Sequence, residues 1–168
     1  MSMERRKTFR LHPEVLSVRE ILEPLIEQHK LKSDKPVRIS ATVEPEGLTL
    51  TADRTHFGNI ISNLIDNAIK YSQGTAEVGI RCRQTESAEQ GKLVEISVSD
   101  RGIGIASEKQ GHLFDKFYRV PTGNLHNVKG YGLGLFYVKT MTEKHGGSVS
   151  VKSEPGKGST FTLRFPKG

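Results

Sequence analysis

Apolar residues recur every three or four positions in three segments of the chain, a pattern typical of helices that bury one face. The first segment follows Ser17-Val-Arg-Glu20, which has the form of a capping box, and contains Pro24, which predicts a kink or a later helix start. The second follows Asp53, a good N-cap residue, and the third extends from Leu133 to His145. The apolar stripe of the second segment comprises Phe57, Ile60, Ile61, Leu64, Ile65, Ala68 and Ile69. Three amphipathic helices are therefore predicted.

Alternation of apolar and polar residues predicts strands in much of the remaining chain. The expected strands are residues 37–43, 48–50, 75–83, 92–100, 148–153 and 160–165. A turn joins the first two, a polar loop at residues 84–91 joins the next two, and the last two form a hairpin around residues 155–158. Paired strands combined with three long helices predict an α+β fold, a two-layer α/β sandwich.

A second, polar row lies on the predicted helix that follows Asp53. Asn59, Asn63 and Asn67 recur every four residues, and Lys70 follows one turn later. Asparagine is a poor residue for a helix interior because its amide competes for backbone hydrogen bonds. The row therefore indicates a ligand that needs carbonyl oxygens and a positive charge, such as a metal-bound polyphosphate. A solvated helix face is the alternative, and this helix alone does not decide between the two.

Two glycine clusters follow downstream. Asp100-Arg-Gly102-Ile-Gly104-Ile105 comes directly after a predicted strand, and its carboxylate could accept a hydrogen bond from the amino group of adenine. A turn aspartate is the alternative for this cluster alone. Gly130-Tyr-Gly132-Leu133-Gly134-Leu135 opens the third helix, where backbone amides and the helix dipole suit phosphates. Its spacing is neither that of a dinucleotide-binding G-x-G-x-x-G nor that of a P-loop. Glycines in the first cluster would let the backbone approach a ligand closely.

The asparagine helix, the two glycine clusters and the aromatic segment Leu113–Val120 between them resemble, in order and spacing, the ATP-binding catalytic domain of bacterial sensor histidine kinases. That domain belongs to the GHKL group of ATPases and kinases. The resemblance implies a mixed β-sheet covered on one face by three helices, with a flexible ATP lid. Residues 1–14 are expected to form an N-terminal junction or linker, and residues 15–168 the catalytic domain.

The resemblance also implies roles for residues of the asparagine row. Asn63 and Asn67 would hold Mg²⁺, which prefers hard oxygen ligands. Lys70 would reach toward a phosphate, and Tyr71 would pack near the nucleotide. Asn59 has no role by resemblance, and we expect it to be a solvated or capping residue.

Further roles follow from the resemblance outside that helix. Asp100 would select adenine, Arg119 would approach the terminal phosphate, and Thr160 would lie at the back of the adenine pocket. Phe114 and Phe117 would anchor the lid by packing beneath it. The expected ATP-binding residues are Asn63, Asn67, Lys70, Tyr71, Asp100, Gly102, Gly104, Ile105, Arg119, Gly130, Gly132, Leu133, Gly134, Leu135 and Thr160.

The residue at position 63 bears on the reaction. In the hydrolases of the group, and in several of its protein kinases, a glutamate matches Asn63, but an amide cannot accept a proton at neutral pH. The nucleophile is therefore expected from outside, and by resemblance it is a histidine on a separate dimerisation domain of a two-component sensor kinase. Asn63, Lys70 and Arg119 are the expected catalytic residues for transfer of the γ-phosphate of Mg-ATP. His12 is assigned to a connecting segment, because Pro13 separates it from Glu14.

Three alternatives remain at this point: a self-contained GHKL-type ATPase, a catalytically silent nucleotide-binding module, and a serine kinase of the anti-sigma type. The third is disfavoured by the amide at Asn63. The chain is expected to be an excised catalytic fragment, monomeric, whose parent passes phosphate to a response regulator.

Composition adds little to this interpretation. The chain has 168 residues, of which 35% are hydrophobic and 26% charged, as in ordinary single-domain proteins. It contains no apolar run of membrane-spanning length. Its single cysteine, Cys82, suits a reducing cytoplasm, and the resemblance implies a parent protein anchored in the inner membrane. The net charge is +6, but basic residues concentrate only in the first ten positions, so neither nucleic acid nor direct membrane contact is expected.

Overall fold

A five-stranded mixed β-sheet forms the centre of the computed structural model, which describes residues 10–115 and 134–168. The strand order is β2-β4-β5-β7-β6, with β2 and β4 parallel and the other neighbours antiparallel. These strands are β2 (Val37–Glu44), β4 (Ala76–Ser87), β5 (Gly91–Asp100), β6 (Ser148–Glu154) and β7 (Gly158–Pro166). A separate antiparallel pair joins β1 (Pro13–Ser17) to β3 (Thr49–Asp53).

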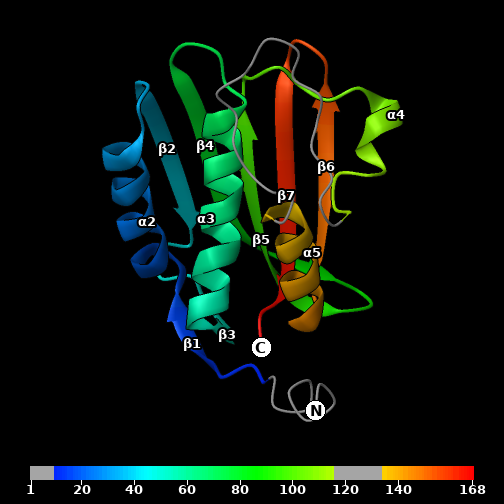
Figure 1. Ribbon diagram of the computed structural model, residues 1–168. Coiled ribbons are helices and arrows are strands. Elements are labelled where there is room, and N and C mark those ends of the chain that lie inside the picture. Colours follow the sequence, from blue (N-terminus) through cyan, green and yellow to red (C-terminus); the bar gives the residue numbers. More distant parts are fainter. Residues whose placement is uncertain (1–9, 116–133) are drawn as a thin grey trace, which may run out of the picture.

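Three long helices cover one face of this sheet (Figure 1). They are α2 (Val18–Lys32), α3 (Arg54–Lys70) and α5 (Gly134–Lys144); the short α4 (Ser107–Gln110) lies beyond β6. The α+β class, the mixed sheet and its cover of three helices are therefore confirmed.

The core lies between the helices and the sheet. Val94, Ile96 and Val98 alternate along β5, are almost fully buried, and belong to the same cluster as the apolar stripe of α3. The Phe57 ring on α3 meets the Phe165 ring on β7 edge to face, with centroids 5.4 Å apart. Position along β5 therefore decides whether a side chain faces the helices.

The opposite face of the sheet is polar. There Glu95 accepts ion-pair contacts from Arg83 Nε at 2.8 Å and from Arg164 Nε at 3.1 Å. This two-faced pattern is usual for sheets with antiparallel strands that pack helices on one side only.

Both predicted helix caps are confirmed. The Ser17 hydroxyl accepts a hydrogen bond from the Glu20 amide at 3.3 Å, and Asp53 Oδ1 accepts one from the His56 amide at 3.0 Å. Helix α2 begins at Val18 and continues through Pro24, so the later start considered for this helix is wrong.

The turn at residues 44–47 does not make a hairpin of its neighbours. Strand β2 pairs with β4, whereas β3 pairs with β1 in the separate two-stranded sheet. The polar loop predicted at residues 84–91 is also wrong, since β4 continues to Ser87 and β5 begins at Gly91. Polar side chains do not prevent backbone pairing at the exposed end of a hairpin.

The N-terminal segment is partly structured. Pro13 and Glu14, which we assigned to a linker, lie in β1 opposite Asp53 and Ala52. The His12 amide donates to Asp53 Oδ2 at 2.8 Å. The division into a linker, residues 1–14, and a catalytic domain, residues 15–168, stays a prediction, and residues 1–9 lie outside the described part of the chain.

Candidate nucleotide-binding site

The asparagine row of α3 faces the first turn of α5. Asn63 Nδ2 donates to the backbone carbonyl of Asn59, 2.8 Å away and one turn earlier. That bond directs the other amide atom, Oδ1, toward α5, where a Cβ added to Gly134 would lie only 3.0 Å from it. The structure thus brings a side-chain carbonyl oxygen to a helix N-terminus, which favours anions.

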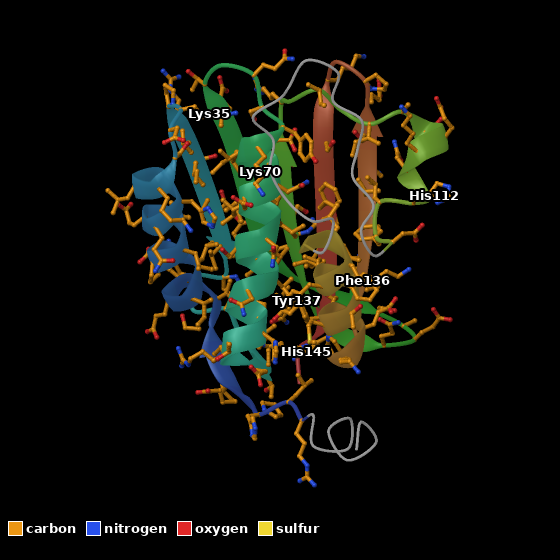
Figure 2. All side chains as sticks on the ribbon, viewed as in Figure 1. Lys35, Lys70, His112, Phe136, Tyr137 and His145 are labelled. Carbon is orange, nitrogen blue, oxygen red and sulfur yellow. The ribbon has the colours of Figure 1, made fainter. Side chains whose placement is uncertain are left out.

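Asn67 and Lys70 lie further along the same helix and are partly exposed. Lys70 Nζ contacts Asp66 Oδ2 at 3.0 Å, so the cation pairs within its own helix (Figure 2 labels Lys70). Both side chains of this pair are at least one-third exposed, and such surface pairs contribute only about 0–1 kcal/mol. A phosphate group could therefore replace the carboxylate as the partner of Lys70.

Asp100 ends β5 on the face that the helices cover. Its neighbours across the sheet are Val78 on β4 and Ser159 on β7. Asp100 Oδ1 accepts a hydrogen bond from the Gly102 amide at 2.8 Å. Burial raises the pKa of Asp100, and hydrogen bonds from the Gly102 and Ser159 backbones offset only part of that shift. A carboxylate offers about four acceptor positions, so this half-buried group can accept a further donor.

The first glycine cluster packs against the chain itself. A Cβ at Gly102 would collide with the carbonyl of Tyr71, and a Cβ at Gly104 with the carbonyl of Glu154. Gly104 also has φ +72°, which L side chains rarely adopt. We predicted these glycines from the approach of a ligand, whereas the geometry explains them by close packing of residues 102–104 against the C-terminal end of α3 and the end of β6.

Hydrogen bonds hold the rest of this segment in place. The Ile103 amide donates to the carbonyl of Tyr71 at 3.2 Å, which joins the segment to the end of α3. The Ile105 amide donates to Ser153 Oγ at 2.7 Å, and the Ile105 side chain is buried in the core. Ile105 is thus a packing residue in this structure.

Thr160 does not lie beside Asp100. It pairs with Ser99, and their hydroxyl oxygens are 2.9 Å apart on the polar face of the sheet. Ser159 occupies the position opposite Asp100; it is buried, and its hydroxyl contacts Ser153 Oγ at 2.7 Å. Counting alternate residues back from the buried Phe161 would have identified Ser159 instead, because one step along a strand changes the face.

Several predicted residues lie outside the described part of the chain: Phe117, Arg119, Gly130, Gly132 and Leu133. Phe114 is described and packs edge to face against Phe161, with centroids 6.1 Å apart. Leu135, in the first turn of α5, packs against the core. Within residues 10–115 and 134–168, no cluster of three or more His, Cys, Asp or Glu side chains could hold a metal. Mg²⁺ prefers hard oxygen ligands, and the side-chain carbonyls of the asparagine row are of that type.

The family of the chain follows from comparison with known proteins. A family model described as histidine kinase-, DNA gyrase B- and HSP90-like ATPase matches residues 52–168, which contain α3, α5 and both glycine clusters. The chain belongs to this family.

Two curated sensor proteins illustrate the sequence similarity. Sensor protein RprX of Bacteroides fragilis (strain YCH46) is 40% identical over 167 residues, which cover 99% of this chain and 32% of that protein. Sensor-like histidine kinase SenX3 of Mycolicibacterium smegmatis (strain ATCC 700084 / mc(2)155) is 36% identical over 154 residues, covering 92% of this chain and 39% of that protein. The chain therefore spans about a third of the length of these relatives.

Solved structures of histidine kinases also resemble this chain. The mycobacterial sensor histidine kinase MprB superposes with a TM-score of 0.73 at 25% identity, covering 92% of this chain and 97% of that one. The nucleotide-free catalytic domain of histidine kinase ThkA superposes with a TM-score of 0.74 at 22% identity. The match covers 94% of this chain and 99% of that one, and it supports the fold. The chain is thus a histidine kinase catalytic domain. Across the residues that the structure describes, no helix is both long and apolar enough to cross a membrane.

Proposed function

We propose that this histidine kinase domain binds Mg-ATP between α3, the first turn of α5 and the segment Asp100–Ile105. We further propose that it donates the γ-phosphate to a histidine on a separate dimerisation domain, from which a response regulator receives it. The observation that carries this proposal is the close approach of Asn63 Oδ1 to Gly134, where an added Cβ would lie only 3.0 Å from that oxygen. It brings together an oxygen ligand suited to Mg²⁺ and a helix N-terminus suited to phosphate.

The two ends of the site favour different parts of the nucleotide. Asp100 is a half-buried acceptor at the end of β5, as the amino group of adenine requires. Asn63, Asn67 and Lys70 lie along α3 and would face the phosphates and their metal. The Tyr71 carbonyl joins the two ends, because it accepts the Ile103 amide of the glycine segment.

The row contains no residue suited to activating a nucleophile. Positions 59, 63 and 67 are all amides, which cannot accept a proton at neutral pH. Phosphoryl transfer depends mainly on positioning and charge stabilisation, so the nucleophile can be supplied by another domain. This favours phosphotransfer to an external histidine over self-contained ATP hydrolysis.

Calorimetric titration with a non-hydrolysable ATP analogue, with and without Mg²⁺, tests the binding step. One-to-one binding that Mg²⁺ strengthens is expected, and a folded sample that binds no nucleotide would refute the proposal. The transfer step is tested by supplying ATP and the histidine-containing domain of the parent kinase. Label on that histidine with slow ADP release from the chain alone is expected; rapid ADP release by the chain alone would favour the ATPase alternative.

A further inference from the structure

Tyr137 joins α5 to α3 one helical turn after Gly134 (Figure 2). Its hydroxyl oxygen lies 2.6 Å from His56 Nδ1 on α3, and the two rings are tilted with centroids 6.0 Å apart. The Asn59 side chain, exposed on the same helix, lies near this hydroxyl group and acts to lower its pKa, against the burial that raises it. One residue of α5 thus bonds to His56 and lies beside Asn59 on α3.

The hydrogen bond between Tyr137 and His56 can run in either direction, because the phenol can donate to a bare Nδ1 and a protonated Nδ1 can donate to the phenol oxygen. Both directions join the two helices through the same pair of atoms.

Asn59 also connects these residues to the candidate site. Its backbone carbonyl accepts the Asn63 amide, which directs Asn63 Oδ1 toward Gly134. Gly134 precedes Tyr137 by one turn of α5, and Asn59 precedes Asn63 by one turn of α3. The two contacts between α3 and α5 are therefore adjacent, one at the candidate site and one a turn away from it.

We propose that Asn59, Tyr137 and His56 form a clasp, a set of contacts between α3 and α5 that positions the first turn of α5 against Asn63. The functional consequence of this inference rests on the proposed nucleotide site. The clasp keeps Asn63 Oδ1 and the helix N-terminus at the spacing that a metal-bound phosphate needs. Without it, α5 moves relative to α3 and the contribution of Mg²⁺ to nucleotide affinity falls. Asn59 and Tyr137 are positioning residues, since neither needs to touch the nucleotide.

Tyr137→Phe is the direct test, because it removes only the hydroxyl group. Binding of a non-hydrolysable ATP analogue is measured with Mg²⁺ and with EDTA. The gain in affinity from Mg²⁺ should fall by about three- to tenfold, the loss expected for one net hydrogen bond, while the affinity in EDTA stays within about twofold. Asn59→Ala should reproduce the loss, and the double variant should add little to it.

Ser62→Ala is the matched control. Ser62 also joins α3 to another helix, through a 2.9 Å contact between its hydroxyl and His29 Nε2 on α2, but this contact lies at a different helix interface. The Ser62→Ala variant should leave the effect of Mg²⁺ unchanged. An equal loss in Ser62→Ala and Tyr137→Phe, or no loss in Tyr137→Phe, would overturn the proposal.

Hydrogen exchange without nucleotide separates the clasp from the proposed function. The amides of residues 138–140 bond to carbonyls in the first turn of α5 and report on its position. They should exchange faster in Tyr137→Phe and Asn59→Ala than in the natural chain or Ser62→Ala. Unchanged exchange overturns the clasp whatever the nucleotide result. If the natural chain fails to bind nucleotide, the proposed function fails, and exchange alone decides on the clasp.

Discussion

Replacing the carboxylate of Asp100 by an amide tests the adenine end of the site with little change of shape. In the Asp100→Asn variant, Oδ1 can still accept the Gly102 amide, which it does at 2.8 Å in the natural chain. The Nδ2 group then takes the place of the second carboxylate oxygen. It would face the amino group of adenine, so that two donors meet and neither finds an acceptor.

The magnitude follows from the loss of a hydrogen bond to a charged group, about 1.5–3 kcal/mol, which corresponds to roughly a 10- to 150-fold loss of affinity. Affinity for an ATP analogue should fall by that factor. A GTP analogue should lose much less affinity or gain some, because guanine presents a carbonyl that the new amide can donate to. The fold should be retained, since the substitution also removes a charge that burial disfavours.

Calorimetry with both analogues in the presence of Mg²⁺ is the assay, and circular dichroism establishes that the variant is folded. Asp34→Asn, which makes the same chemical change at an exposed residue, is the control. An unchanged affinity for the ATP analogue in a folded Asp100→Asn variant would refute the assignment. An equal loss for both nucleotides would mean that Asp100 supports the pocket without reading the base.

Three further substitutions test the local geometry. Gly104→Ala should lower the free energy of unfolding by about 2–4 kcal/mol, because the new Cβ would overlap the Glu154 carbonyl and φ at this position is positive. Gly111→Ala is the control and should have little effect, because a Cβ there meets nothing within 4 Å. Gly58→Ala, in the interior of α3 with nothing within 4 Å of its Cβ, should stabilise the chain by about 0.5–1 kcal/mol in denaturant titrations. Burial acts to raise the pKa of Asp53, but backbone hydrogen bonds from His12 and His56 outweigh it and the pKa is lowered. The carboxylate therefore stabilises the fold at pH values above its ordinary pKa, and this stabilisation is lost as the pH falls through the lowered pKa. The Asp53→Asn variant keeps a capping side chain but cannot ionise. It should therefore flatten the acid limb of a plot of the free energy of unfolding against pH.

The elements that the sequence predicted well are those whose signal is local. Ser17 and Asp53 cap helices as their positions indicate, and the apolar stripe of α3 is buried throughout. The errors in topology concern which strands pair with one another. Strands β2 and β3 follow one another in the chain, yet they pair with β4 and β1, which no periodicity specifies.

The candidate site shows the same division at the level of single residues. Asp100 was predicted correctly to end a strand, and Thr160 was predicted for the adenine pocket by resemblance, whereas the residue opposite Asp100 in the sheet is Ser159. A slip of one residue changes the face of the sheet, and so exchanges Ser159 for Thr160. Family patterns identify the neighbourhood of a site, whereas strand register decides which side chain enters it.

Asn59 illustrates what spacing on one helix cannot supply. The four-residue interval from Asn59 to Asn67 predicts a shared face, and the hydrogen bond from Asn63 to the Asn59 carbonyl agrees with it. Asn59 is exposed, as expected for a solvated residue, yet Tyr137 of α5 lies beside it and bonds to His56, 81 positions away in the sequence. Only the packing of α5 on α3 brings these residues together, and spacing on one helix does not predict it.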